Sequence, residues 1–202
     1  MFKQIGDYIE SWIRTFIVFI TNYLPVKVIR DENGVPFLHR YHIFSLTSDG
    51  PGAYIHHFLK SDERGQFHNH AWIKSFSFIL CGGYKEEILK ECKTDYYTVD
   101  RPRWTFNFLD GVKTYHRVML PDNGDAWTLF FYQKRKQVWG MYNLKGEYKP
   151  MSDQISDKDG DWPTYAKPGL SIDSHLNHEG KVIATVDIVV IYDNKVLLIK
   201  RG

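Results

Sequence analysis

The chain has 202 residues, of which 43% are hydrophobic and 16% aromatic, so it can bury a substantial core and disorder is excluded as its default state. Its 26 basic and 24 acidic residues nearly cancel, which argues against a nucleic-acid partner or an anionic membrane surface. The two cysteines, Cys81 and Cys92, form no CxxC pair and make no disulfide framework. Because no cleavable signal pattern is visible either, we expect a cytoplasmic protein.

Residues 1–25 predict an amphipathic helix. Apolar residues recur at three- and four-residue steps from Ile5 to Leu24, and Pro25 ends the pattern. The longest uninterrupted apolar run, Phe16–Ile20, is far shorter than the ~20 residues that span a membrane. We therefore expect this helix to pack on the rest of the chain or between two copies of it, with no membrane partner.

Residues 26–150 predict an all-β domain, because short apolar runs alternate with turn signals, one of which is Gly82-Gly83. Many short strands at regular spacing favour a sandwich or barrel over βαβ units. The clearest predicted strands are Phe37–Phe44, Ala53–Leu59, Ser75–Leu80 and Trp127–Tyr132.

Three histidines form the candidate site. His68 and His70 are separated by one residue, and side chains at i and i+2 of a strand leave from the same face. His116 follows later, after a stretch rich in aromatic and β-branched residues. If the strands close into a barrel, three neutral imidazoles can converge on one divalent metal ion.

The other histidines of the β domain carry weaker signals. His39 and His42 lie on a predicted strand, where we expect surface or edge positions. His56 and His57 are adjacent, so they point to opposite faces and only one of them faces inward.

Residues 37–150 resemble the cupin superfamily, and within it a group of small, largely uncharacterised phage and bacterial cupins. The resemblance implies a double-stranded β-helix (jelly-roll) barrel, whose first motif supplies two His and usually a Glu and whose second motif supplies one His. The segments that carry it are His57–Asp62, His68–Trp72, Ile79–Tyr84, His116–Val118, Trp127–Phe130 and Val138–Gly140.

The slot where many cupins carry the metal-binding Glu holds Lys74 and Ser75, so the implied ligand set is His68, His70 and His116. Three imidazoles with an open position suit Zn, Fe, Ni or Mn, and we expect one of these divalent ions as cofactor. The resemblance further implies a small-molecule ligand and a homodimer. It specifies no reaction, because cupin folds host many chemistries.

Two other functions stay open. Arg64-Gly65 with His68 and His70 also resembles the metal-free nucleotide-sugar isomerases and epimerases of the cupin fold, in which such histidines act as acid and base. Alternatively, the barrel is a non-catalytic ligand-binding module that regulates a hydrolase downstream in the same protein.

The C-terminal part suggests that hydrolase. Residues 151–180 are polar and rich in turn signals, which predicts a linker. Residues 181–202 hold two apolar runs around Asp193-Asn194, a hairpin signal, and resemble the first hairpin of a Nudix hydrolase domain. The Nudix box with its paired Glu residues is absent here, so the resemblance implies the start of a truncated Nudix domain, whose activity would need residues beyond 202.

Overall fold

The computed structural model describes residues 2–31, 33–47, 49–136, 139–151, 162–171, 189–192 and 195–198. The chain divides into two compact units, residues 1–170 and 171–202. The helices described in the first unit are α1 (Phe2–Thr21) and the short α2 (Trp162–Tyr165). Its strands are β1 (Val26–Arg30), β2 (Pro36–Ser45), β3 (Gly52–Phe58), β4 (Gln66–His68), β5 (Lys74–Leu89), β6 (Tyr96–Pro102), β7 (Phe106–Asp110), β8 (His116–Met119), β9 (Ala126–Tyr132), β10 (Gly140–Asn143) and β11 (Tyr148–Pro150).

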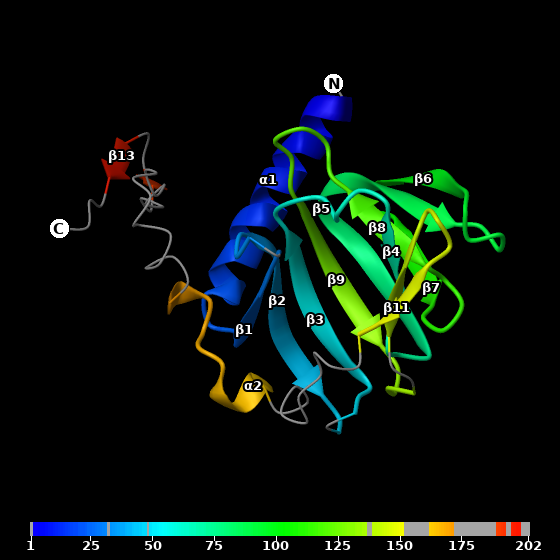
Figure 1. Cartoon of the computed structure of the whole chain (residues 1–202). Coiled ribbons are helices and arrows are strands. Elements are labelled where there is room, and N and C mark those ends of the chain that lie inside the picture. Colours follow the sequence, from blue (N-terminus) through cyan, green and yellow to red (C-terminus); the bar gives the residue numbers. More distant parts are fainter. Residues whose placement is uncertain are drawn as a thin grey trace. The chain divides into compact units, whose positions relative to one another are not determined.

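The strands form two antiparallel sheets that share the long strand β5 (Figure 1). One sheet has the order β1-β2-β3-β9-β5-β7. The other has the order β6-β5-β8-β4-β10-β11. The first unit is therefore a double-stranded β-helix (jelly-roll) barrel preceded by a helix, and the predicted mostly β fold class is confirmed.

Strand β5 differs from the prediction, because Gly82-Gly83 does not end it. Its first half pairs with β9 and β7, and its second half pairs with β6 and β8. Gly82 has a φ of +71°, and a Cβ there would lie 2.1 Å from the backbone oxygen of Asp125. Only glycine fits such a position. The glycines thus mark the bend at which β5 passes from one sheet to the other.

Side chains of β2, β3 and β9 alternate between the inside of the barrel and its outer face. His56 lines the internal cavity, as does Thr128 opposite it in the register. The next residue, His57, lies on the outer face, where its ring stacks on Trp127 with 3.8 Å between the ring centroids. The two adjacent histidines therefore face opposite ways, as predicted.

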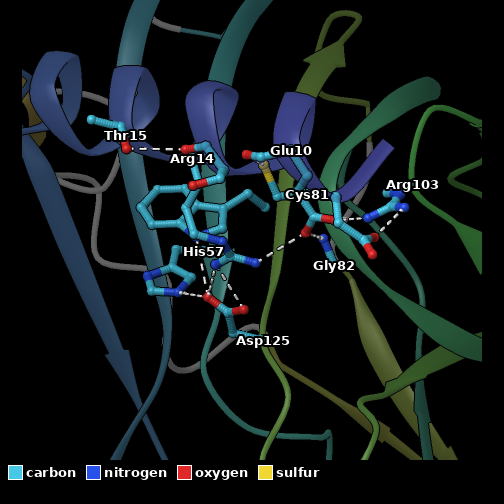
Figure 2. A network of polar contacts seen from close by, with 11 residues as sticks. Glu10, Arg14, Thr15, His57, Cys81, Gly82, Arg103 and Asp125 are labelled. Atoms are coloured by element: carbon cyan, nitrogen blue, oxygen red, sulfur yellow. Dashed lines mark hydrogen bonds and ion pairs between the residues drawn. The ribbon is translucent and has the colours of Figure 1, made fainter. Parts of the chain in front are cut away.

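Helix α1 is attached to this outer face by charged side chains (Figure 2). Arg14 donates to both carboxylate oxygens of Asp125, at 2.8 and 2.6 Å. Oδ2 of Asp125 also accepts from Nε2 of His57, at 2.8 Å. Burial alone would raise the pKa of Asp125, but the hydrogen bonds from His57 and Arg14 outweigh it and lower that pKa. The carboxylate is thus charged where the helix meets the barrel.

A second attachment of α1 involves Glu10, which accepts from the backbone N–H of Gly82 at 2.7 Å and pairs with Arg103 (Figure 2). The helix ends at Thr21, earlier than Pro25, and the chain leaves it in a turn in which the N–H of Tyr23 bonds to the carbonyl of Ile20. Its opposite face exposes large apolar side chains, namely Ile5, Tyr8, Ile9, Trp12, Phe16 and Phe19. In the described residues, no helix combines the length and apolarity that crossing a membrane requires.

Residues 162–170 lie within the segment predicted as a linker, and they pack against the barrel. Trp162 is buried against Tyr54, Phe130 and Tyr132. The N–H of Val26 donates to the carbonyl of Lys167. Residues 152–161 and 172–180 lie outside the described residues, and the linker boundaries 151–180 stay a prediction.

The second unit is described for β12 (Val189–Tyr192) and β13 (Lys195–Leu198). They pair as antiparallel strands with Val189 opposite Leu198 and Tyr192 opposite Lys195. The predicted pairing of the two apolar runs is therefore confirmed, while the predicted turn residues Asp193 and Asn194 lie outside the described residues. The remaining residues of 181–202 lie outside the described ones.

The expected surface position of His39 is wrong. The residue is 4% exposed, because it faces the ring of His57 on the side of the sheet that α1 covers. Its Nε2 has no hydrogen-bond partner among the described residues. Burial, with help from the charges of His57 and Arg30, lowers the pKa of His39 to about 4.

This burial predicts acid sensitivity. As the pH falls below ~6.5, the unfolded chain protonates this histidine, whereas the folded chain does so only near pH 4, so stability is lost across that window by up to about 3 kcal/mol. We expect His39→Met to flatten the decline in unfolding free energy between these pH values, measured by denaturant titration. His42→Met, in a less buried position of the same strand, serves as the control. An unchanged slope in His39→Met would contradict the assignment.

Candidate metal centre

The structure brings the three predicted histidines together at one place in the cavity. His68 on β4 lies directly opposite His116 on β8, and their ring centroids are 4.8 Å apart. His70 follows β4, with ring centroids 5.2 Å from His68 and 5.0 Å from His116. Each residue offers one ring nitrogen, and these atoms all lie within 4.8 Å of one another. Register and strand periodicity thus produce the cluster.

His70 is held by its backbone and by an aromatic neighbour. Its N–H donates to the carbonyl of Gly111, and its ring stacks on Trp72 with 5.6 Å between centroids and 23° between planes. This orientation leaves Nε2 of His70 2.8 Å from Nε2 of His116. Two ring nitrogens this close either share a proton or present their lone pairs to one cation.

The protonation state of His116 follows from Glu86. Nδ1 of His116 lies 2.5 Å from Oε1 of Glu86, whose side chain is fully buried. A carboxylate accepts but does not donate, so Nδ1 carries a proton, and it is Nε2 that is left to offer a lone pair. That lone pair faces His70. A carboxylate behind a histidine is the arrangement that commonly orients a metal ligand.

Glu86 is in turn fixed by two further residues. Arg101 donates to Oε2 of Glu86 through Nε at 2.8 Å and approaches it with Nη2 at 2.7 Å, while Nδ2 of Asn107 donates to Oε1 at 2.9 Å. Burial alone would raise the pKa of Glu86. The hydrogen bond from His116 outweighs it and, with Asn107 and Arg101, lowers that pKa to about 2. The carboxylate is therefore ionised at neutral pH.

The other two histidines are neutral at the same pH. Burial lowers the pKa of His68 to about 4. It lowers the pKa of His70 well below the ordinary value, and the positive charge of the Arg40 guanidinium adds to both effects. Neutral imidazole is the form that ligates a metal, so the cluster is ready to bind one without first releasing protons.

The cluster opens into a cavity of about 430 Å³ inside the barrel. Aromatic rings line much of this cavity, among them Tyr54, Phe58, Trp72 and Phe130. Of its polar lining residues, Asn107 and Thr128 each have a buried side-chain oxygen that has no hydrogen-bond partner among the described residues. A mostly aromatic cavity with a few polar groups is typical of a small-molecule site.

Sequence reasoning missed Glu86. The position expected for a cupin Glu holds Lys74, which is exposed, and Ser75, which is buried outside the cluster. The carboxylate comes instead from the second half of β5, beyond Gly82. The sequence held one signal for it. If the strand is continued past the glycines, Glu86 and Ile88 fall at i and i+2 and therefore share one face.

Of the comparisons with known proteins, the one with solved structures gives matches. No protein-family model matches the chain, and no curated protein does. Among solved structures, Fe(II)-HppE with an alternative substrate is similar at 14% identity and a TM-score of 0.46, over 55% of this chain and 57% of that one. Hydroxypropylphosphonic acid epoxidase from S. wedmorenis is similar at 13% identity and a TM-score of 0.42, over 53% and 55%.

A protein of unknown function from Vibrio parahaemolyticus is similar at 10% identity and a TM-score of 0.36, over 53% of this chain and 97% of that one. The chain spans just over half the length of the HppE and epoxidase chains that it matches. Because these TM-scores all lie below 0.5, the site is interpreted from its own residues.

The buried position of Glu86 predicts a large effect on stability. Glu86→Gln removes the charge that faces Arg101 and His116, so we expect a loss of about 3 kcal/mol in the unfolding free energy. Glu87→Gln is the matched control, because the neighbouring Glu87 pairs with Arg117 instead of the cluster and should cost less. Denaturant titration of both variants measures the difference. Equal losses would contradict the central role of Glu86.

Proposed function

We propose that His68, His70 and His116 bind a divalent metal ion, and that the barrel is a metal-binding cupin domain for a small molecule. The observation that carries the proposal is the hydrogen bond from His116 to the buried Glu86. It keeps the proton on the far nitrogen and turns a lone pair toward the other two imidazoles. A histidine that only filled the core would need no such orientation.

The residues fit such an ion in number, protonation and spacing. In a tetrahedral zinc site with bonds of ~2.0–2.1 Å, two ligand nitrogens lie about 3.4 Å apart, so nitrogens within 4.8 Å need to approach by at most ~1.4 Å. Rotation of the half-buried ring of His68 supplies such a movement. Zn, Fe, Ni and Mn all accept three imidazoles with open positions.

Each residue then has a separate task. Glu86 holds the proton on His116, and the indole of Trp72 holds the plane of His70. The aromatic wall limits the water that reaches the cluster. A bound divalent ion supplies Lewis acidity toward an oxygen of the ligand, or activates water or O₂.

The first test is metal content. We expect about one divalent ion per chain by elemental analysis. We also expect added metal at 100-fold over its Kd to raise the unfolding free energy by about 2.7 kcal/mol. His70→Ala and His116→Ala should lose both effects, whereas His42→Ala, outside the cluster, should keep them. Absence of bound metal together with an unchanged melting temperature on metal addition would remove the proposal.

The second test separates the role of Glu86 from that of the ligands. Glu86→Gln leaves all three imidazoles in place but weakens the acceptor that orients His116. We expect its metal affinity to fall 10- to 100-fold, roughly the usual effect of losing such a partner. The matched variant Glu87→Gln should bind metal as the native chain does, and competition with a chromogenic chelator measures all three. An unaltered affinity in Glu86→Gln would show that orientation by the carboxylate is unimportant.

A second candidate function is a metal-free sugar isomerase or epimerase that uses His68 and His70 as acid and base. The contact of 2.8 Å between Nε2 of His70 and Nε2 of His116 favours it, because neutral rings at that distance can pass a proton. This function requires incorporation of deuterium from D₂O at a sugar carbon by chelator-treated protein. A nucleotide-sugar panel without exchange would eliminate it.

Several expectations stay predictions and are not needed for the proposed function. These are the Nudix-like start at residues 181–202, regulation of a downstream hydrolase by a non-catalytic barrel, the homodimer and the cytoplasmic location.

A further inference from the structure

We propose that the ligand of this cavity is a small anion, a carboxylate or phosphonate with a planar or apolar body, and that Arg40 binds its charged group. The inference deepens the proposed function. It rests on that function only for the end of the ligand that contacts the metal. The cavity, the guanidinium and the aromatic wall are features of the barrel itself.

Arg40 lies in the middle of β2, opposite His56 in the register, and its half-buried side chain lines the same cavity as the three histidines. Nε of Arg40 donates to Nε2 of His56 at 3.2 Å. The guanidinium lies over the ring of Tyr54, 5.2 Å from its centroid, and 5.7 Å from that of Trp72. These contacts hold a planar cation in a fixed orientation inside the barrel.

The same indole connects the guanidinium to the histidine cluster. Trp72 stacks on His70 and also lies beneath Arg40. Arg40, His68, His70 and His116 all line the same cavity. A ligand of modest size can therefore reach the guanidinium and the histidines at once.

The charges that line the cavity favour an anion. Among the lining residues that the structure describes, three are basic, namely Lys27, Arg40 and Arg135, and two are acidic, namely Asp49 and Asp62. Asp49 is exposed. Asp62 accepts from the backbone N–H of Val118 at 2.7 Å and faces His68, with 3.8 Å between Oδ2 and Nδ1. An arginine fork matches a carboxylate or phosphonate in bidentate geometry, which a lysine does not.

The size and walls of the cavity restrict the rest of the ligand. A volume of about 430 Å³ accommodates a small molecule but not a polymer. Stacked rings favour a planar or apolar body. The buried oxygens of Asn107 and Thr128, without hydrogen-bond partners among the described residues, leave room for donors on the ligand or for water.

The test uses benzoate and its neutral isostere benzamide as probes, titrated calorimetrically into the full chain with and without added zinc. We expect the native chain to bind benzoate roughly tenfold or more tightly than benzamide. Arg40→Gln should lose this preference while it keeps its zinc content. Arg40→Lys should retain part of it, because it keeps the charge but not the fork. Arg64→Gln removes an equal charge at an exposed position and should behave as the native chain.

Three results would overturn the proposal. They are no preference for benzoate in the native chain, a preference that persists in Arg40→Gln, and a preference that disappears equally in Arg64→Gln. If benzoate binding requires zinc and survives in Arg40→Gln, the anion sits on the metal alone, and the metal proposal stands without this one. If benzoate binds through Arg40 in a chain that holds no metal, this inference stands and the metal proposal falls.

Discussion

The buried carboxylate of Glu86 is the group on which the interior of the barrel depends. It is fully enclosed, yet it stays ionised because Arg101, Asn107 and His116 all donate to it or face it with positive charge. A buried charge costs several kcal/mol unless it is paired in this way. One of the contacts that offset this cost comes from Nδ1 of His116, which points toward the carboxylate. In this orientation of the ring, Nε2 faces the cavity. Stability of the fold and orientation of the candidate ligand therefore arise from one contact.

The barrel uses its two faces for different chemistry. Inside, uncharged imidazoles and aromatic rings surround the cavity, and Arg40 is the cation held against them. Outside, Asp125 and Glu10 bind α1 through charged hydrogen bonds (Figure 2). Strand alternation alone separates these environments, since His56 and His57 are consecutive residues with opposite surroundings. The outer face thus binds the helix, while the inner face forms the cavity.

Much of this was accessible from the sequence, and the failures have physical causes. Periodicity located α1, β2, β3 and β9, and the i, i+2 spacing placed His68 beside His70. Contacts between distant strands cannot be read from the sequence. The contacts of Glu86 with His116 and of Arg40 with Trp72 were therefore not predicted. The surface position expected for His39 is wrong for a related reason. Strand alternation shows which residues share a face of the sheet, but it does not show that α1 covers that face. Gly82-Gly83 was misread because the positive φ that suits a turn also suits a bend within a strand.

The bend at Gly82 connects the contacts that hold α1 with the strand that carries Glu86. Its N–H binds Glu10 of α1, its Cα lies against the backbone of Asp125, and the strand that leaves it carries Glu86 to the opposite sheet. A side chain introduced here would push against the chain segment that anchors the helix and would also tilt the strand behind the histidines. The contact that holds α1 to the barrel and the strand that carries Glu86 toward the histidines therefore meet at a single glycine.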